Sequence, residues 1–266
     1  MKRSGRMISL AAGLLSAVLL SACAGGQPPV TDNEYATRVD RPDNQRRANI
    51  RLQLAGEYYQ QRQYQVALDE VKQALQISPN FVDAHSMAAL IYMDLGETKL
   101  AEEHFARAIR LAPQDPDLSN NYGWFLCQNG RAEQSIPYFE TAFRNKAYQS
   151  PARALTNAGV CSLKLKNAAA ADKYLNDAFR IDPSNPVTSI GLARLNYERG
   201  DDRSARFYIN RVTASEAISA EALWLAIKIE RRLGDRAAEV SLVTQLGRRY
   251  PNSSEFAAYQ RGAFNE

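Results

Sequence analysis

Hydrophobic and small residues return along the chain with a period close to 34 residues, in units that begin near residues 48, 82, 116, 152, 186 and 220. Most units carry a small residue at the eighth position and an alanine at the twentieth. Small side chains at these positions let two helices approach closely. A fixed period of this length is typical of repeat proteins in which each unit is one supersecondary element. We therefore expect six similar units.

Glycines and prolines divide each unit into two helices. Glycine recurs at the fifteenth position, where a residue that adopts positive φ closes a helix. Proline recurs at the thirty-second position, where it cannot continue the second helix. Residues 255–264 can add a helix that caps the last apolar face. The residues concerned are Gly96, Gly130, Gly200 and Gly234, and Pro79, Pro113, Pro183 and Pro251.

This pattern resembles the tetratricopeptide repeat over about residues 48–253. The resemblance implies an all-α, right-handed superhelix of six helix-turn-helix repeats whose first helices line a concave groove, in a domain that spans residues 48–266. By analogy with the family, the second, fifth, ninth and twelfth positions face that groove. They include Leu52, Tyr59, Leu90, Met93, Asn120, Trp124, Ile190, Arg194, Tyr197 and Trp224.

The groove positions are most apolar and aromatic at the N-terminal end, which suits an amphipathic helix or an extended apolar segment of a partner. Trp124 and Trp224 have two interpretations. They are either exposed anchors for a partner, since tryptophan is enriched in binding hot spots, or packed core residues.

The N-terminal 22 residues have the pattern of a secretory signal, with basic residues before an apolar run from Met7 to Leu20. The run is short for a transmembrane helix, which needs roughly 20 apolar residues. The order Leu20-Ser21-Ala22-Cys23 resembles the bacterial lipoprotein signal. This resemblance implies acylation of Cys23 and, with Ala24 following, a lipid anchor on the periplasmic face of the outer membrane. Residues 23–47 are polar and lack an apolar period, so we expect a flexible tether there.

Composition and charge exclude several classes of protein. The 266 residues are 45% hydrophobic and 23% charged, with 14 Gly and 11 Pro, as in ordered proteins. Three of the 33 bases and none of the 29 acids lie in the leader, so the mature chain keeps 33 − 3 = 30 bases against 29 acids. This balance gives no support for a nucleic-acid partner.

The sequence holds no motif for catalysis, phosphate binding or metal binding such as G-x-S-x-G, a glycine-rich phosphate loop or H-E-x-x-H. His85 and His104 show no ligand spacing, and we expect them on helix surfaces or in packing. We therefore predict a protein that is not an enzyme and has no cofactor and no metal.

Two cysteines remain once Cys23 is acylated. Cys127 and Cys161 fall on the first helices of neighbouring units, and such helices lie about 8 to 10 Å apart. Because the periplasm is oxidising, we predict a disulfide between them, with two buried thiols as the alternative.

The run Asn-Asn-Tyr-Gly-Trp-Phe-Leu-Cys at residues 120–127, with the lipoprotein signal and the six repeats, resembles the pilotins (PilF/PilW type), the lipoproteins of type IV pilus biogenesis. The resemblance implies a monomer that binds secretin subunits, promotes their outer-membrane localisation and multimerisation, and so supports twitching motility. The alternative is a general adaptor lipoprotein for peptidoglycan hydrolases or barrel assembly. The sequence leaves open the secretin segment, the stoichiometry, and whether the concave or the convex face binds.

Overall fold

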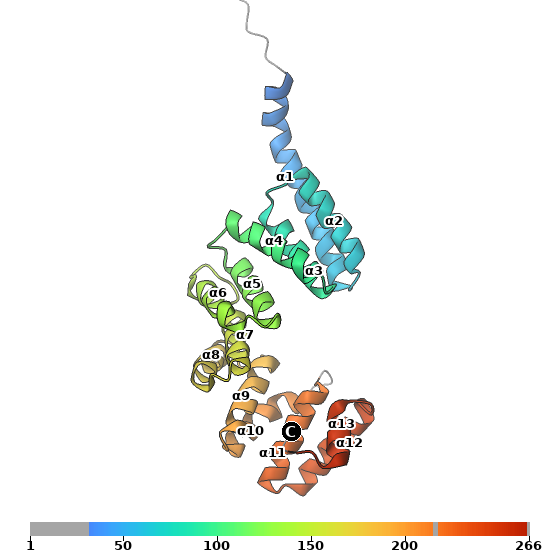
Figure 1. The fold of residues 1–266 in the computed structure, drawn as a ribbon, viewed down its shortest axis with the longest axis vertical. Coiled ribbons are helices and arrows are strands. Elements are labelled where there is room, and N and C mark those ends of the chain that lie inside the picture. Colours follow the sequence, from blue (N-terminus) through green and yellow to red (C-terminus); the bar gives the residue numbers. More distant parts are fainter. Residues whose placement is uncertain (1–31, 215–217, 265–266) are drawn as a thin grey trace, which may run out of the picture.

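The protein, seen in a computed structural model, is described over residues 32–214 and 218–264, with side chains from residue 43 onward. Within these residues the chain forms thirteen α-helices and no strand. Figure 1 shows the helix pairs following one another from α1, in blue, to α13, in red. The all-α repeat architecture is therefore confirmed.

The helices form six pairs and a final single helix. The first helices of the pairs are α1 (Asp32–Gln60), α3 (Val82–Asp94), α5 (Pro116–Gln128), α7 (Pro151–Lys164), α9 (Pro186–Glu198) and α11 (Ala220–Leu233). Their partners are α2 (Tyr64–Ile77), α4 (Thr98–Leu111), α6 (Ala132–Arg144), α8 (Ala168–Ile181), α10 (Asp202–Thr213) and α12 (Arg236–Arg249), and α13 (Ser254–Arg261) follows. Four first helices begin at the predicted residue and α7 begins one residue earlier.

Helix α1 begins well before the first predicted unit. It places residues 32–47 in a helix, where the sequence led us to expect a flexible tether. The sequence of the segment is polar and has no apolar period, so periodicity carries no signal there. Local pairs such as Arg46 with Asp43, at 2.9 Å, support it, and extending an already packed helix costs little. The signal and Cys23 lie outside the described residues.

The turn inside each pair contains a residue with positive φ. Four of the six are the predicted glycines, with φ between 76° and 82°. In the first and fourth pairs, Arg62 and Lys166 take the same position with φ of 61° and 56°. The backbone requires a left-handed residue at this point in every pair, and side chains with a Cβ are strained there.

Small residues allow close contact within the pairs, as predicted. A Cβ added to Gly159 on α7 would lie 2.5 Å from Cγ of Leu175 on α8. A Cβ on Gly123 of α5 would lie 2.9 Å from the Phe139 ring on α6. Both distances are too short for a carbon contact, so these glycines fix how closely the helices pack.

The first helices line the inner face of the stack. Each contacts the next first helix, from α1 to α3 and on to α11, whereas within the described residues no second helix has comparable contact with the next second helix. Helices on the inside of a curved stack lie closer together than those outside, so the concave surface is built by the first helices. Among the described helices, none is both long and apolar enough to cross a membrane.

Candidate partner-binding groove

The concave surface is hollowed along the C-terminal half of the stack. A cavity of about 540 Å³ lies across α5, α7 and α9. Its apolar floor includes Trp124, Val160 and Ile190, one from each helix, and Val187 on its wall is 49% exposed. Such a cavity, with exposed apolar side chains on a rigid helical scaffold, can receive an apolar side chain of a partner.

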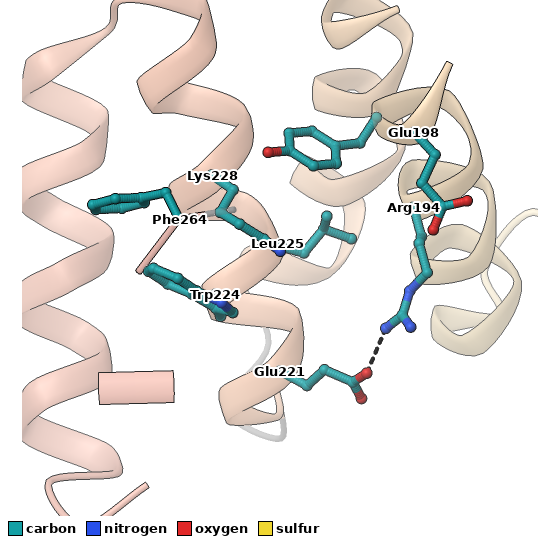
Figure 2. Close-up of a pocket in the computed structure, with 8 residues that line it drawn as sticks. Arg194, Glu198, Glu221, Trp224, Leu225, Lys228 and Phe264 are labelled. Carbon is teal, nitrogen blue, oxygen red and sulfur yellow. Dashed lines mark hydrogen bonds and ion pairs between the residues drawn. The ribbon is translucent and has the colours of Figure 1, made fainter. Parts of the chain in front are cut away.

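A second cavity of about 450 Å³ lies between α9 and α11. Figure 2 shows Arg194 of α9 reaching Glu221 of α11 across its mouth, where the two form an ion pair. The two cavities share Arg194, Glu198 and Glu221 among their lining residues. They therefore form one continuous groove, which we call the C-terminal groove, from α5 to α11.

Aromatic rings and a lysine line the far end of the C-terminal groove. The Lys228 ammonium lies 5.6 Å from the ring centroid of Tyr197 and 5.7 Å from that of Trp224, within cation–π range. Burial lowers the pKa of Lys228. Phe264, beyond α13, closes this end and stacks near Trp224 with ring centroids 5.1 Å apart. This end of the groove thus combines aromatic rings with charges of both signs, from Arg194 and Lys228 and from Glu198 and Glu221.

The two tryptophans differ in their surroundings. Trp124 is half-buried and lines the larger cavity, so part of its ring is available to a partner. Trp224 is only 8% exposed and packs in the last core cluster, against Phe264. Trp124 therefore fits an exposed anchor better, and Trp224 fits a packed wall of the groove.

Asn120 is a predicted groove residue that the structure buries, with 2% exposure. Its side-chain oxygen accepts a hydrogen bond from Nδ2 of Asn157 on α7 at 2.9 Å. Its Nδ2 donates to Asn121 at 3.3 Å. The amide of Asn120 is used to join two repeats, and the neighbouring amides of Asn121 and Asn157 are the partly exposed ones.

The predicted groove residues of the first two repeats mainly pack within the protein. Leu52 and Tyr59 contact the first core cluster, and the Tyr59 hydroxyl donates to Asp94 at 2.6 Å. Burial and this carboxylate raise the pKa of Tyr59. Leu90 and Met93 pack against the next cluster. The sequence located the most apolar groove positions here, but their side chains are half-buried among neighbours.

Cys127 and Cys161 face each other between α5 and α7. Their Cα atoms are 6.0 Å apart, their sulfur atoms lie at bonding distance, and both side chains are at most 2% exposed. This geometry suits a disulfide between α5 and α7, two of the helices that line the larger cavity. The oxidised state of the pair stays a prediction, and the thiol measurement in the Discussion tests it.

Sequence reasoning missed one juxtaposition. His85 on α3 and His104 on α4 have no ligand spacing in the sequence, yet their Nδ1 atoms are 3.1 Å apart. Both residues are half-buried. The missed signal is the antiparallel pairing of helices in a unit, which brings the fourth position of a unit near the twenty-third.

Comparison with known proteins shows what the chain resembles. Two tetratricopeptide-repeat models match residues 58–120 and 126–186. The chain is 29% identical over 248 residues to the type IV pilus assembly protein PilF of Pseudomonas aeruginosa, covering 92% of this chain and 95% of that protein.

Two solved structures are similar over nearly their whole length. One is PilW, described as a widely conserved type IV pilus biogenesis factor, with 32% identity and a TM-score of 0.74, covering 80% of this chain and 98% of that one. The other is Pseudomonas aeruginosa PilF, with 28% identity and a TM-score of 0.76, covering 83% and 99%. Both similarities cover at least 80% of this chain.

Proposed function

Because the chain belongs to the family of type IV pilus biogenesis proteins built from tetratricopeptide repeats that includes PilF and PilW, we propose that it acts as a pilotin. In this proposal it is a non-catalytic lipoprotein, anchored through Cys23 on the periplasmic face of the outer membrane. It binds subunits of the pilus secretin and promotes their localisation and multimerisation.

The observation that carries the proposal is the C-terminal groove, on a chain that is similar to PilW over 80% of its length and to PilF over 92%. The groove offers an apolar floor at Trp124, Val160 and Ile190 and charged residues toward its far end. An amphipathic segment can place apolar side chains on that floor and polar ones toward solvent. A scaffold that covers such a segment keeps it from aggregating before ring assembly buries it.

The membrane anchor and the groove act together in this mechanism. Acyl chains contribute about 0.8 kcal/mol for each buried CH₂, so several chains hold a protein stably at a bilayer. A secretin subunit held in the groove then shares the surface where it must insert. Confinement to one surface raises the effective concentration of subunits without any new contact.

Secretin rings in cells test the proposed role. We expect heat-resistant secretin multimers to disappear from gels when the gene is deleted. With Cys23→Ala, we expect a folded, soluble periplasmic protein and mislocalised secretin. Rings that are unchanged in both strains contradict the pilotin role, and a Cys23→Ala protein still found wholly in outer-membrane fractions contradicts the lipid anchor.

A matched pair of variants tests the groove. Trp124→Glu places a charge on the groove floor and should weaken binding of the purified secretin periplasmic region at least about 30-fold, as expected for an aromatic hot spot. Phe207→Glu is the control, because Phe207 is 55% exposed on a second helix, away from the groove. If both variants bind the secretin region as tightly as the parent protein, with unchanged circular dichroism, the groove is not the binding site. If only Phe207→Glu loses affinity, binding takes place on the convex face.

A further inference from the structure

The two histidines of the second repeat form a compact pair that the proposed function does not use. His85 Nδ1 and His104 Nδ1 are 3.1 Å apart, and the ring centroids are 5.2 Å apart. The other ring nitrogen of His85, Nε2, lies 3.0 Å from the carbonyl oxygen of Pro79. The ring of Tyr92 packs on His104 with centroids 5.5 Å apart. Backbone and aromatic contacts thus hold both rings in place.

The hydrogen bonds of the pair determine which nitrogens carry hydrogen. A carbonyl oxygen can only accept, so His85 Nε2 must donate and His85 Nδ1 must present a lone pair when the ring is neutral. The 3.1 Å contact then requires Nδ1–H on His104. Neutral imidazole is the form that binds metals.

We propose that His85 and His104 form an exchangeable site for a transition-metal dication such as Zn²⁺, in which their Nδ1 atoms are two ligands and water supplies the others. Two nitrogens bound to one tetrahedral ion at about 2.0 to 2.1 Å lie roughly 3.3 to 3.4 Å apart, close to the spacing seen here. Imidazole is a preferred ligand of zinc, copper and nickel. The Pro79 carbonyl orients His85 as backbone carbonyls orient ligating histidines elsewhere.

The surroundings set the character of the site. Within the described residues, no third histidine, cysteine or carboxylate joins the pair to complete a ligand set. A site with two protein ligands stays open to water and exchanges its ion, unlike a closed structural zinc site. The positive charge of Arg107 acts on His85, and its guanidinium donates to Asn80 at 2.6 Å. This charge should weaken the binding of a cation, so removing it with Arg107→Gln should strengthen metal binding.

Metal binding requires one tautomer change and no net loss of protons. His104 must move its hydrogen from Nδ1 to Nε2, which frees the second lone pair. Because that hydrogen moves within the His104 ring and stays on it, binding at pH 7.5 should release close to zero protons. Calorimetry in two buffers of different ionisation enthalpy measures that number. Release of about one proton for each ion bound would contradict this arrangement of ligands.

Zinc titration of the full chain, purified without an added histidine tag and with any free thiols alkylated, tests the proposal. We expect one Zn²⁺ for each chain, bound at least about tenfold more weakly by His85→Gln and by His104→Gln, since even second-shell changes cost tenfold or more. Arg107→Gln should bind about two- to fivefold more tightly. Tyr92→Phe is the matched control, because it keeps the aromatic ring beside His104 and should bind as the parent does.

A second readout keeps the test decisive if a variant does not fold. The chain contains only two histidines, so every imidazole signal in a nitrogen-15 NMR spectrum belongs to this pair. Stoichiometric Zn²⁺ should shift both Nδ1 signals of the parent protein. Imidazole signals that do not move at saturating Zn²⁺, or zinc affinity that persists in both glutamine variants, would overturn the proposal.

Discussion

The first two repeats and the last four are built from the same kind of helix pair, but they differ in how the side chains at their groove positions are packed. In α1–α4, apolar residues at groove positions are half-buried among their neighbours, as Leu52 and Tyr59 are. In α5–α11, equivalent positions border an open groove lined by Trp124, Ile190 and Arg194. The repeat consensus therefore determines which side chains face inward, whereas the sizes of their neighbours determine whether a cavity remains.

The cysteine pair lies within the last four repeats, and breaking the predicted bridge should destabilise the C-terminal part of the stack, α5 to α13, more than α1 to α4. A bridge that closes a loop with a sequence separation of 34 should stabilise that part by about 3 to 4 kcal/mol on the chain-entropy model. Reduction should therefore speed amide hydrogen exchange in α5 and α7 and leave α1 and α3 unchanged.

Thiol titration decides whether the bridge exists. In a Cys23→Ser protein, denatured without reductant, we expect no reactive thiol, and two after reduction. Two reactive thiols before reduction would show that Cys127 and Cys161 are buried free cysteines.

The next prediction compares one groove position from each part. Leu52→Glu puts a charge against the first core cluster and should lower the free energy of unfolding by about 2 to 3 kcal/mol. Trp124→Glu should lower it by less than about 1 kcal/mol, because the Trp124 side chain borders the open cavity. Urea denaturation followed by circular dichroism measures both. Equal losses would mean that the two positions are packed alike.

Two helical glycines give opposite expected effects on stability. Gly159→Ala should cost about 1 to 3 kcal/mol, because the new Cβ would lie 2.5 Å from Leu175. Gly56→Ala meets no atom within 4 Å and should stabilise α1 by up to about 1 kcal/mol through helix propensity. Thermal denaturation of the two variants checks the signs. A stable Gly159→Ala protein would show that α7 and α8 can separate without cost.

Substitutions in the turns are expected to change the free energy of unfolding least. Arg62→Gly and Lys166→Gly should each stabilise the protein by about 1 kcal/mol, because the turn keeps its positive φ and loses the Cβ strain. Gly96→Ala, at the same position of the second pair, should destabilise by a similar amount. Melting temperatures test the series, and unchanged values for all three would mean that the turns relax freely.

Much of the fold could be predicted because the period is carried by residues with a fixed physical role. Glycine at the turn and proline after the second helix located the helix pairs to within a residue or so. The helix over residues 32–47 was not predicted, because a polar helix has no apolar period to detect. The burial of Asn120 was not predicted for a different reason, since it depends on a hydrogen bond from Asn157 in another repeat. The histidine pair likewise depends on a contact that spacing alone does not reveal.

Helix α1 extends beyond its partner α2 in Figure 1, and the additional turns form a strut at the N-terminal end of the repeats. Residues 32–47 add about 24 Å of helix at 1.5 Å for each residue. With the proposed anchor at Cys23, a stiff strut of this length would follow only eight residues of chain, 24–31, after the membrane. Such a strut would hold the repeats away from the bilayer, so secretin segments would be selected by their distance from the membrane as well as by their chemistry.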